Sequence, residues 1–593
     1  MFEENIFKYL IEEKRLTRIY NQISTARILS FIAAFVAAIY FANTGNGIAV
    51  FSTSLLFLIS FVALIVWHNK IKFRRRHAQF LFQINEDEVK RNQGDLSSFE
   101  QGNEFISIHH PYSTDLDVFG QNSLFQLLNR TTTITGKTKL ASWLLTPASQ
   151  QEISLRQDAV LELKNDIEFC QNFQAAGLHY QDKKADFASL KNWLDQPAVV
   201  LKNKALLIGS YLMPLISMML LAGFIWYNIT FGYLLVALLL NGLMLRKVFS
   251  YALKLTEQTS RGVSTLASIS HLIKEVEKVK FQSAHIKSIQ VNLSSNEVPA
   301  SRIILRLVKI LDFFNARANM FYAMFNFIFL FDLHLIRWAE KWRYNYGKDV
   351  AIWFDGISEF EVLASLAAFS YANEDFSTPT IVPDDYCFAA EELAHPLIKP
   401  NERIKNNFKV ENKGQIVIIT GSNMSGKSTF LRTIGINMVL AYAGAPVCAS
   451  KLHLSIFQIF TGMRTQDDLK EHISSFYAEL KRIEQLLHLY ESSALPVLFM
   501  LDEILKGTNS QDRHKGATAL VKQLHNTNSI GFVSTHDLEL GEMATKLDYC
   551  QNYSFNSRIV EDKIEFDYKI SDGICRSFNA SALMKNIGIQ IDN

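Results

Sequence analysis

A glycine-rich segment at residues 421–429 carries residue types suited to binding phosphate groups. It reads Gly-Ser-Asn-Met-Ser-Gly-Lys-Ser-Thr and fits the pattern G-x-x-x-x-G-K-[ST]. Glycines let backbone N–H groups approach phosphate oxygens, and the positive end of a following helix attracts the same charge. In this pattern Lys427 reaches the β- and γ-phosphates of a nucleotide and Ser428 ligates Mg²⁺. The expected cofactors are therefore ATP and Mg²⁺. The predicted nucleotide-binding residues are Gly421, Ser422, Asn423, Met424, Ser425, Gly426, Lys427, Ser428 and Thr429.

Paired carboxylates follow a second apolar run. Residues 497–501 read Val-Leu-Phe-Met-Leu and lead directly into Asp502 and Glu503. A buried strand that ends in two acids is typical of the Walker B arrangement, in which the first acid holds Mg²⁺ and the second polarises the attacking water. A third run, 530–535, ends at His536, which could sense the γ-phosphate. The predicted catalytic residues are Glu503, His536 and Lys427, and the predicted metal ligands are Ser428 and Asp502.

Strands and helices of an α/β domain must position these segments. Residues 416–420 form the continuous apolar run expected of a buried parallel strand, and a helix-like stretch begins at Phe430. After Gly414, short β-branched runs alternate with helical stretches, which is typical of α/β domains. Residues 120–200 and 250–375 instead show helical periodicity. The sequence therefore predicts an α/β P-loop domain plus an all-α core and lever domain.

Two long uncharged stretches predict four transmembrane helices in two hairpins. Residues 28–67 and 205–245 contain no charged residue. Each is long enough for two spans of about 20 residues and is interrupted by a turn-like segment. Lys and Arg flank both stretches and are absent from both turns, so the positive-inside rule places the flanks in the cytoplasm. We expect a multi-pass protein of the inner (cytoplasmic) membrane whose ATPase domain faces the cytoplasm. Buried core hairpins are the alternative.

Composition excludes several classes of protein. Five cysteines without a CxxC pair exclude a disulfide scaffold and a zinc ribbon. A formal net charge of +2 excludes a strongly basic DNA-coating protein. A third apolar stretch, 318–331, is too short to span a membrane and is expected to form a buried core helix.

The predicted division of the chain has seven parts. They are a cytoplasmic N-terminal segment (1–27), the first transmembrane hairpin (28–67), a cytoplasmic linker (68–110), the first part of the helical core (111–204), the second transmembrane hairpin (205–245), the second part of the core with the lever (246–378) and the P-loop ATPase domain (379–593).

Several of these motifs resemble the MutS family. Residues 418–429, 501–510 and 534–536 resemble its ATPase, whereas 115–136 and 361–367 resemble parts of its helical core and lever. The resemblance covers roughly 110–200 and 350–590. It implies an ABC-like ATPase that works as a homodimer, in which each site is completed by the signature segment of the partner.

The signature segment is the weakest part of this resemblance. Its counterpart is 467–476, where Ser474 takes the place of the signature Ser/Thr. The Ser-Gly-Arg that precedes it in the family is replaced here by Glu471-His472-Ile473. Asn509 matches the loop that crosses the dimer interface. The resemblance therefore adds Ser474 and Asn509 to the predicted nucleotide-binding residues.

Departures from the family leave the function open. The mismatch-reading domain is absent, and the only room for a DNA clamp is 256–301, which has no strong basic character. The first hypothesis is a membrane-anchored MutS-like ATPase that acts on DNA in mismatch repair or recombination. The alternative is a membrane mechanoenzyme that couples ATP hydrolysis to a protein or lipid partner, and a transporter-type ABC half-subunit is the third. The residue that would stack on adenine is not evident; the family uses a side chain upstream of the strand that precedes the glycine-rich loop, and Arg403, Ile404 and Phe408 all lie in that range.

Overall fold

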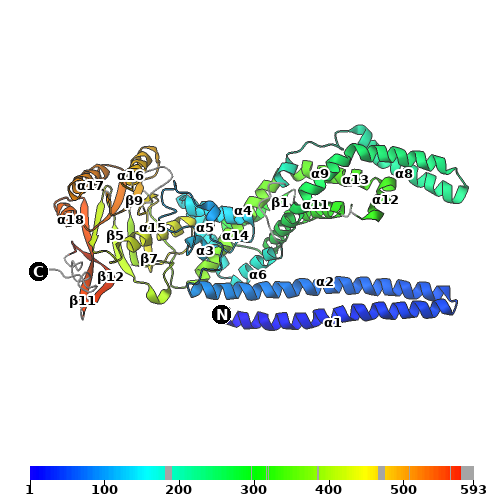
Figure 1. The fold of residues 1–593 in the computed structure, drawn as a ribbon, viewed down its shortest axis with the longest axis horizontal. Coiled ribbons are helices and arrows are strands. Elements are labelled where there is room, and N and C mark those ends of the chain that lie inside the picture. Colours follow the sequence, from blue (N-terminus) through cyan, green and yellow to red (C-terminus); the bar gives the residue numbers. More distant parts are fainter. Residues whose placement is uncertain are drawn as a thin grey trace.

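The computed structural model describes residues 1–180, 190–295, 297–315, 317, 319–383, 386–464, 475–506, 508–560 and 563–575. The molecule is elongated (Figure 1): a domain of sheets and helices lies at one end, a helical core lies in the middle, and long helical hairpins extend to the other end. The polypeptide is thus a mixed α/β structure in which the six-stranded and four-stranded sheets lie in the C-terminal part and a two-stranded sheet lies among the helices.

A six-stranded sheet organises the C-terminal domain. Its strand order is β12-β11-β6-β10-β9-β8; β12 pairs antiparallel with β11, and the other neighbours pair in parallel. All residues of β6 and β10 are buried, as expected of central parallel strands covered on both faces. The strands are β6 (Ile416–Gly421), β8 (Gln458–Gly462), β9 (Val497–Asp502), β10 (Ser529–Thr535), β11 (Cys550–Val560) and β12 (Lys563–Asp572).

Four helices and a smaller sheet complete this domain. The second sheet has the order β3-β7-β4-β5. The helices are α15 (Lys427–Ala443), α16 (Ser475–Ser492), α17 (Ser510–His525) and α18 (Leu538–Ala544), and the strands are β3 (Thr380–Ile381), β4 (Phe388–Leu393), β5 (Asn406–Val410) and β7 (Lys451–Leu454). The predicted strand–loop–helix order is therefore present at residues 416–443, where β6 leads into α15.

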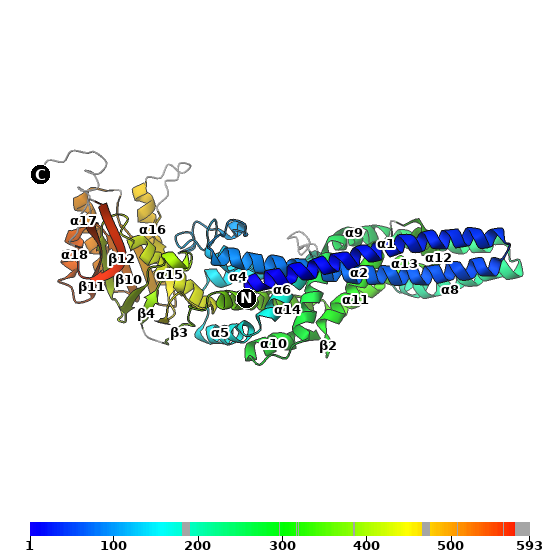
Figure 2. The ribbon, with the colours of Figure 1, turned by 90° about the horizontal axis from the view of Figure 1, so that it is seen from below.

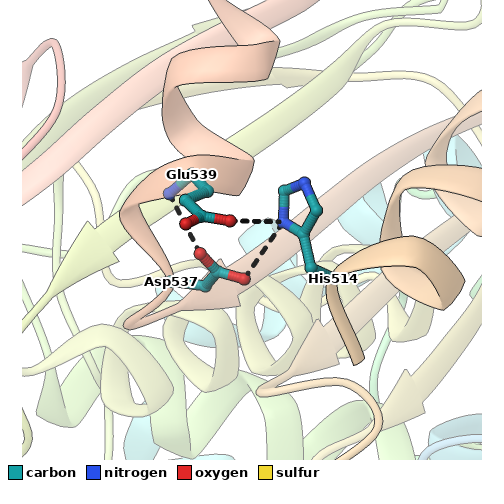
Figure 3. Close-up of side chains that lie close together, drawn as sticks. All are labelled: His514, Asp537 and Glu539. Carbon is teal, nitrogen blue, oxygen red and sulfur yellow. Dashed lines mark hydrogen bonds and ion pairs between the residues drawn. The ribbon is translucent and has the colours of Figure 1, made fainter. Parts of the chain in front are cut away.

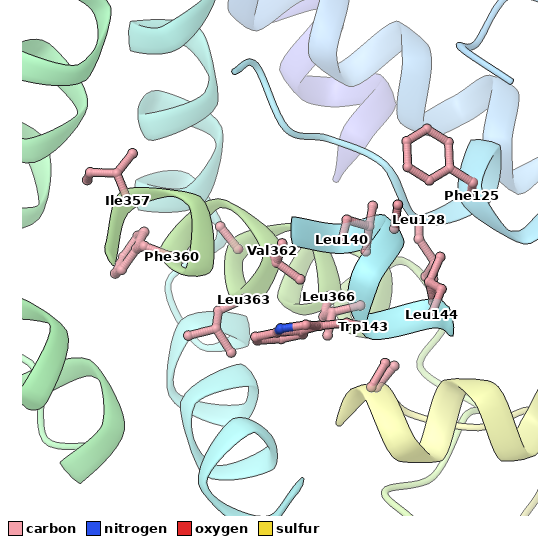
Figure 4. Close-up of a cluster of buried hydrophobic side chains, with 14 of the residues drawn as sticks. Phe125, Leu128, Leu140, Trp143, Leu144, Ile357, Phe360, Val362, Leu363 and Leu366 are labelled. Atoms are coloured by element: carbon pink, nitrogen blue, oxygen red, sulfur yellow. The ribbon is translucent and has the colours of Figure 1, made fainter. Parts of the chain in front are cut away.

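The helical core is built around α14 (Asp349–Ala372), most of whose residues are buried. Side chains of α4 (Ile134–Leu145) and α14 pack together there (Figure 4), among them Leu140, Trp143 and Phe360. Helices α3 (Leu124–Leu128), α5 (Gln150–Lys164), α6 (Ile167–Leu178) and α10 (Ala284–Asn292) also contact α14. The remaining elements of these regions are α11 (Ala300–Asn315), the strand pair β1 (Ser294–Ser295) and β2 (Val298–Pro299), and the 3-10 turns Asn103–Phe105 and Pro400–Glu402.

A buried carboxylate joins α14 to the start of α4. Glu361 Oε1 accepts hydrogen bonds from the backbone N–H groups of Thr132 (2.7 Å) and Thr133 (3.1 Å). Burial raises the pKa of Glu361 even though these donors favour its charged form. A Cβ on Gly136 would lie 2.2 Å from Glu361 Oε2, so this position requires glycine. The segment that resembles the family's core opening is thus fixed by a residue from the lever segment.

The first hairpin is much longer than its apolar segment. It consists of α1 (Phe2–Asn43, 42 residues) and α2 (Gly47–Asn92, 46 residues). The predicted separate segment 1–27 is the first part of α1. The prediction of a linker over 68–110 is wrong for its first 25 residues, because α2 continues to Asn92.

A heptad seam explains why the helices continue beyond the apolar stretch. Tyr9, Leu16 and Ile23 are the buried residues of α1, and they recur every seventh position. Leu16 and Ile23 pack with Ile71 and Ala78 of α2, which have the same spacing. Such a seam stabilises two antiparallel helices in water. The hairpin therefore continues beyond both ends of the apolar segment 28–67.

The second hairpin consists of α8 (Lys204–Tyr227) and α9 (Phe231–Glu277). Helices α1, α2, α8 and the first part of α9 are long and apolar enough to cross a membrane, as predicted. The turns of both hairpins lie at the end of the molecule that is farthest from the sheets (Figures 1 and 2). Region 256–301 forms the end of α9, α10 and the strand pair β1–β2, and side chains such as Leu266, Ile273 and Ile286 are fully buried in the core.

The third apolar stretch does not form a buried core helix, so that prediction is wrong. Residues 318–331 include α12 (Met320–Phe329), which meets α13 (Phe331–Tyr346) at an angle of 81°. Leu330 breaks the helix with a left-handed φ of 51°. Tyr322 Oη donates to Asp332 Oδ1 (2.8 Å), and the backbone N–H of Asp332 donates to Asn326 Oδ1 (3.0 Å). These bonds hold the bend, and most large apolar side chains of α12 remain exposed.

Candidate functional site

The loop 421–426 joins the buried strand β6 to α15. Gly426 has a φ of +102°, and α15 begins directly after it with no side-chain cap on its first N–H groups. Unpaired N–H groups and the helix dipole make such a terminus a binding site for anions. A Cβ on Gly426 would lie 3.0 Å from the ring of Tyr568, and one on Gly421 would lie 2.9 Å from the carbonyl oxygen of Phe555. Both glycines of the motif are therefore required by close packing.

Lys427 is the first residue of α15 and is buried at the base of the loop. Its Nζ donates to the carbonyl oxygens of Gly421 (2.8 Å) and Ser422 (2.9 Å). Burial lowers the pKa of Lys427, and the negative charges of Glu503 and Asp502 only partly offset this effect. The ammonium group is thus held where the loop curves around an anion.

Ser428 and Asp502 meet across the sheet edge. Ser428 Oγ donates to Asp502 Oδ2 (2.5 Å), and Ser534 Oγ donates to the other carboxylate oxygen. The three residues come from the start of α15 and the ends of β9 and β10. A hydroxyl and a carboxylate oxygen are ligands that Mg²⁺ prefers, so this pair has the donor set that the predicted metal requires.

Glu503 follows Asp502 in a left-handed conformation with a φ of 54°. Its carboxylate lies 3.1 Å from Lys506 Nζ and 3.7 Å from His536 Nδ1. Burial raises the pKa of Glu503, but the hydrogen bond and charge of Lys506, with the charges of His536 and Lys427, outweigh burial and leave it below its usual value. Glu503 is therefore ionised at neutral pH, as a general base must be.

A cavity of about 460 Å³ lies against the loop. Residues 423–429 and Glu503 line one part of it, and Ile404 and Tyr568 line another. Of the three candidates for adenine contact, only Ile404 reaches the cavity. Phe408 is buried in an aromatic cluster with Phe430, Phe532 and Tyr553, and Arg403 donates to the carbonyl oxygens of Pro396 and Ile398.

Sequence reasoning missed Tyr568 and His395, which also line the cavity. Burial, followed by the charge of Arg432, lowers the pKa of His395 to about 4, so its ring is neutral at pH 7. Tyr568 lies 147 positions from Gly421 and belongs to the edge strand β12, which no motif marks. Only the fold brings these two side chains to the loop.

Three of the predicted nucleotide-binding residues that the structure describes, Gly421, Ser422 and Asn509, do not line this cavity. Asn509 is the N-cap of α17, where its Oδ1 accepts from the Asp512 N–H (2.9 Å) and its Nδ2 donates to Asp512 Oδ2 (2.7 Å). Ser474 lies outside the described residues, as do Glu471, His472 and Ile473 of the same segment. Both Ser474 and Asn509 were predicted to act across a dimer interface.

A histidine and two acids meet directly after His536 (Figure 3). His514 Nδ1 lies 3.4 Å from Asp537 Oδ2 and 3.8 Å from Glu539 Oε2. Such a group could hold a metal ion. However, Asp537 Oδ1 caps α18 by accepting from the Glu539 N–H (2.9 Å), so the group also has a structural role in joining α17 to α18.

Comparison with known proteins finds family matches for two separate parts of the chain. The family model described as MutS domain V matches residues 417–589, and that described as MutS domain III matches 108–202. The chain belongs to the MutS family. A DNA mismatch repair protein MutS from Natronomonas pharaonis is 30% identical over 221 residues, which make up 37% of this chain and 25% of that protein. One from Thermotoga petrophila is 32% identical over 240 residues, or 39% of this chain and 29% of that protein.

The MutS-family match confirms the predicted resemblance and also limits it. The domain V match contains the loop, Asp502, Glu503 and His536. The chain spans only about a quarter of the length of these curated relatives. The apolar hairpins at 28–67 and 205–245 lie outside both matched ranges.

The two MutS-family domains are joined by acids from the start of the matched core domain. Asp115 accepts hydrogen bonds from Thr461 Oγ1 (2.7 Å) and the Arg464 N–H (3.1 Å), which lie at and just beyond the end of β8. Asp117 pairs with Arg464 (2.8 Å) and with Arg432 of α15 (3.5 Å). The helix that begins at the phosphate loop is therefore in direct contact with the helical core.

The first hairpin is fixed to the MutS-like core by a buried ion pair. Glu88 of α2 lies 2.7 Å from Arg130 and 3.1 Å from Arg91, and all three side chains are almost fully buried. Burial raises the pKa of Glu88, but the charges and hydrogen bonds of Arg130 and Arg91 keep it below its usual value. Since α2 is one continuous helix, the core and the apolar tip of this hairpin form one mechanical unit.

Proposed function

We propose that this MutS-family chain is a Mg²⁺-dependent ATPase anchored in the membrane by its two hairpins. The observation that carries the proposal is the convergence of Lys427, Ser428 and Glu503 on one cavity, with Asp502 bonded to Ser428. Two separate segments of the chain, the start of α15 and the end of β9, supply the chemistry that phosphoryl transfer to water requires.

Each residue has one role in the proposed reaction. The N–H groups at the start of α15 and Lys427 would bind and orient the phosphates, and Ser428 and Asp502 would hold the metal ion. Bound Mg²⁺ supplies charge neutralisation on the phosphate oxygens. Glu503 accepts the proton of the attacking water, while His536 keeps the carboxylate of Glu503 oriented from 3.7 Å away.

A homodimer is part of this proposal. Met424 is 82% exposed beside the cavity, although it lies in the centre of the phosphate loop. A second copy of the chain would cover this loop and exclude water from the phosphates. Asn509, at the start of α17, and the segment that contains Ser474 are the proposed contributions of that copy.

The proposed output is movement of the membrane hairpins. Helices α2 and α9 each run without a break from the core into an apolar segment, and Asp117 links the core to α15. Any change at the phosphate loop thus has a rigid route to both hairpins. This supports the mechanoenzyme hypothesis, in which ATP hydrolysis moves the hairpins and thereby acts on a protein or lipid in the membrane.

A DNA ligand is the second candidate, because the relatives carry the name DNA mismatch repair protein. Against it, region 256–301 forms the end of α9, α10 and the β1–β2 pair, and inward side chains of these elements, such as Leu266 and Ile286, are buried in the core. Measuring ATPase rates with homoduplex, mismatched and branched DNA at two salt concentrations separates the candidates. Stimulation by DNA that falls with salt would establish DNA as the ligand. A rate unaffected by any DNA supports the membrane role.

The ATPase proposal is tested with the full chain purified in detergent. Wild type should hydrolyse ATP only when Mg²⁺ is present, and Lys427→Ala should abolish both nucleotide binding and hydrolysis. Lys413→Ala, an exposed lysine before β6, is the matched control and should hydrolyse normally. Full activity in Lys427→Ala would overturn the assignment of this site.

A further inference from the structure

The bent helix pair reaches the middle of the second hairpin. Asn241 Nδ2 of α9 donates to Ser217 Oγ of α8 (2.9 Å) and to the carbonyl oxygen of Phe327 in α12 (2.8 Å). At a rise of 1.5 Å per residue, Ser217 lies about 20 Å along α8 from Lys204. The end of α12 therefore lies at the depth of the central apolar residues of the hairpin.

Exposure on α12 has the pattern of a surface that faces lipid. Met320, Phe321 and Met324 are 80%, 65% and 55% exposed, and no charged residue lies within the helix. In water such a patch would be a strong liability, whereas at this depth in a bilayer it is an ordinary lipid-facing surface. Helices α12 and α13 thus form a re-entrant segment that enters and leaves on the same side.

A cavity of about 530 Å³ lies between this segment, α8 and α11. Seven of its nine lining residues are apolar, including Pro214, Phe313, Leu335 and Trp338. Its size is within the range of sites for small-molecule ligands. An apolar cavity that opens beside lipid-facing helices fits a hydrocarbon chain.

Positive charge lies at the cytoplasmic side of this cavity. Lys309 lines it, and Arg302 and Arg306 precede Lys309 on the exposed face of α11. Arg337 follows the lining residue His334 by one turn and stacks on Tyr211, 4.4 Å from the ring centre. Arg337 does not itself line the cavity, so Lys309 is the charged side chain that an anionic headgroup entering the cavity would meet.

We propose that this cavity binds one anionic phospholipid of the cytoplasmic leaflet. Its acyl chain lies between α8, α11 and α13, and its phosphate is held by Lys309, with Arg302 and Arg306 of the same helix adding positive charge nearby. The inference rests on the proposed membrane anchoring. Because the site lies between the second hairpin and the lever helices, lipid binding would tie the movement of the lever to the composition of the membrane.

Trp338 provides a direct reporter of the lipid. The full chain is reconstituted in phosphatidylcholine vesicles with about one lipid in ten replaced by brominated phosphatidylglycerol or brominated phosphatidylcholine, since bromine quenches nearby indoles. The signal of Trp338 is the difference between wild type and Trp338→Phe. Brominated phosphatidylglycerol should quench this signal more strongly than brominated phosphatidylcholine does.

Lys309→Gln tests the charge contribution. It should weaken the preference for phosphatidylglycerol about fivefold, the effect of one Lys at an anionic surface, whereas Lys309→Arg should retain it. Lys247→Gln is the matched control, because Lys247 is exposed on α9 and does not line the cavity. Equal quenching by both lipids, or no quenching of Trp338, would overturn the inference.

Flotation of the same vesicles separates the two proposals. A chain that does not float with the vesicles would contradict the membrane anchoring itself. A chain that floats and hydrolyses ATP, but whose Trp338 signal shows no preference for phosphatidylglycerol, contradicts only the lipid site.

Discussion

Glu503 occupies a left-handed backbone conformation that few residues other than glycine adopt, and its carboxylate faces both Lys506 and His536. Replacing it by glutamine keeps the shape but removes the group that takes a proton from water. We expect Glu503→Gln to lower kcat about 100-fold or more while ATP binding persists. Steady-state hydrolysis and equilibrium binding of a fluorescent ATP analogue measure the two effects separately.

The matched control for this change is Glu539→Gln, which removes an exposed carboxylate that lies 3.8 Å from His514 and outside the cavity. It should leave kcat within about twofold of wild type, since a general base contributes only when it reaches the reacting water. Normal hydrolysis by Glu503→Gln would instead show that another group accepts the proton.

His395 makes the nucleotide domain sensitive to acid. Its pKa is lowered to about 4 in the folded protein, mainly by burial, while an unfolded histidine titrates near 6.5. The unfolded state thus binds the proton first, so stability is present above the unfolded value and is lost as pH falls towards 4. His395→Gln should reduce the loss of thermal stability between pH 7 and pH 5, as measured by scanning fluorimetry.

An exposed histidine is the control for this titration. His453→Gln, on β7, should keep the acid sensitivity of the wild type. If His395→Gln had the same pH profile as wild type, the neutral state of His395 would contribute nothing to stability.

At the scale of single residues, motifs predicted the residues proposed to bind phosphate but not those that line the rest of the cavity. Lys427, Ser428, Asp502 and Glu503 have fixed spacing from glycines or from a strand end, so their proximity follows from local rules. Tyr568 reaches Gly426 only because β12 pairs with β11 at the edge of the sheet. No single-sequence rule specifies that pairing.

At the scale of elements, helix α2 is fixed to the core by a buried network of charged side chains. Glu88→Ala would leave Arg130 and Arg91 buried without their carboxylate partner. Breaking a buried pair in this way costs about 3–5 kcal/mol. We expect a clear fall in the thermal midpoint of the detergent-solubilised protein, detected by circular dichroism at 222 nm.

Glu86→Ala tests whether the effect belongs to the buried network or to the helix in general. Glu86 is on the same helix, is less buried than Glu88 and is not part of the network. It should lower stability by less than about 1 kcal/mol. Equal effects of the two changes would mean that the ion pair does not fix α2.

Helix continuity is where sequence reasoning about elements failed. Hydrophobicity alone limited the first hairpin to residues 28–67. The spacing of Tyr9, Leu16 and Ile23 instead indicates a seam between the helices that begins well before residue 28. In α12 the error had the opposite cause: a short apolar run was assigned to the core by its length. Its bent, exposed position depends on contacts of Asn241 and Asp332 that the apolar run itself does not reveal.

For the whole molecule, the arrangement separates chemistry from its proposed site of action. The phosphate loop lies at one end, and the hairpin turns lie at the other (Figure 2). Contacts of Asp115, Asp117 and Glu88 connect the intervening parts in sequence. Such a molecule can transmit a domain movement over its full length only if the hairpins are held by the membrane, which makes topology the decisive property.

Topology predicts which exposed sites a membrane-impermeant reagent can reach. Thr44→Cys and Tyr227→Cys place thiols at the two hairpin turns, and Ile108→Cys places one on the exposed surface of the core segment. Because basic residues flank both apolar stretches on their core side, the turns should lie outside the cytoplasm. An impermeant maleimide should label the first two variants in intact cells and Ile108→Cys only after lysis. The parent protein, whose five cysteines are buried or half-buried, gives the background. Labelling of Ile108→Cys in intact cells would show that the orientation is the opposite one. The proposed ATPase domain would then lie outside the cytoplasm, where it could not obtain ATP.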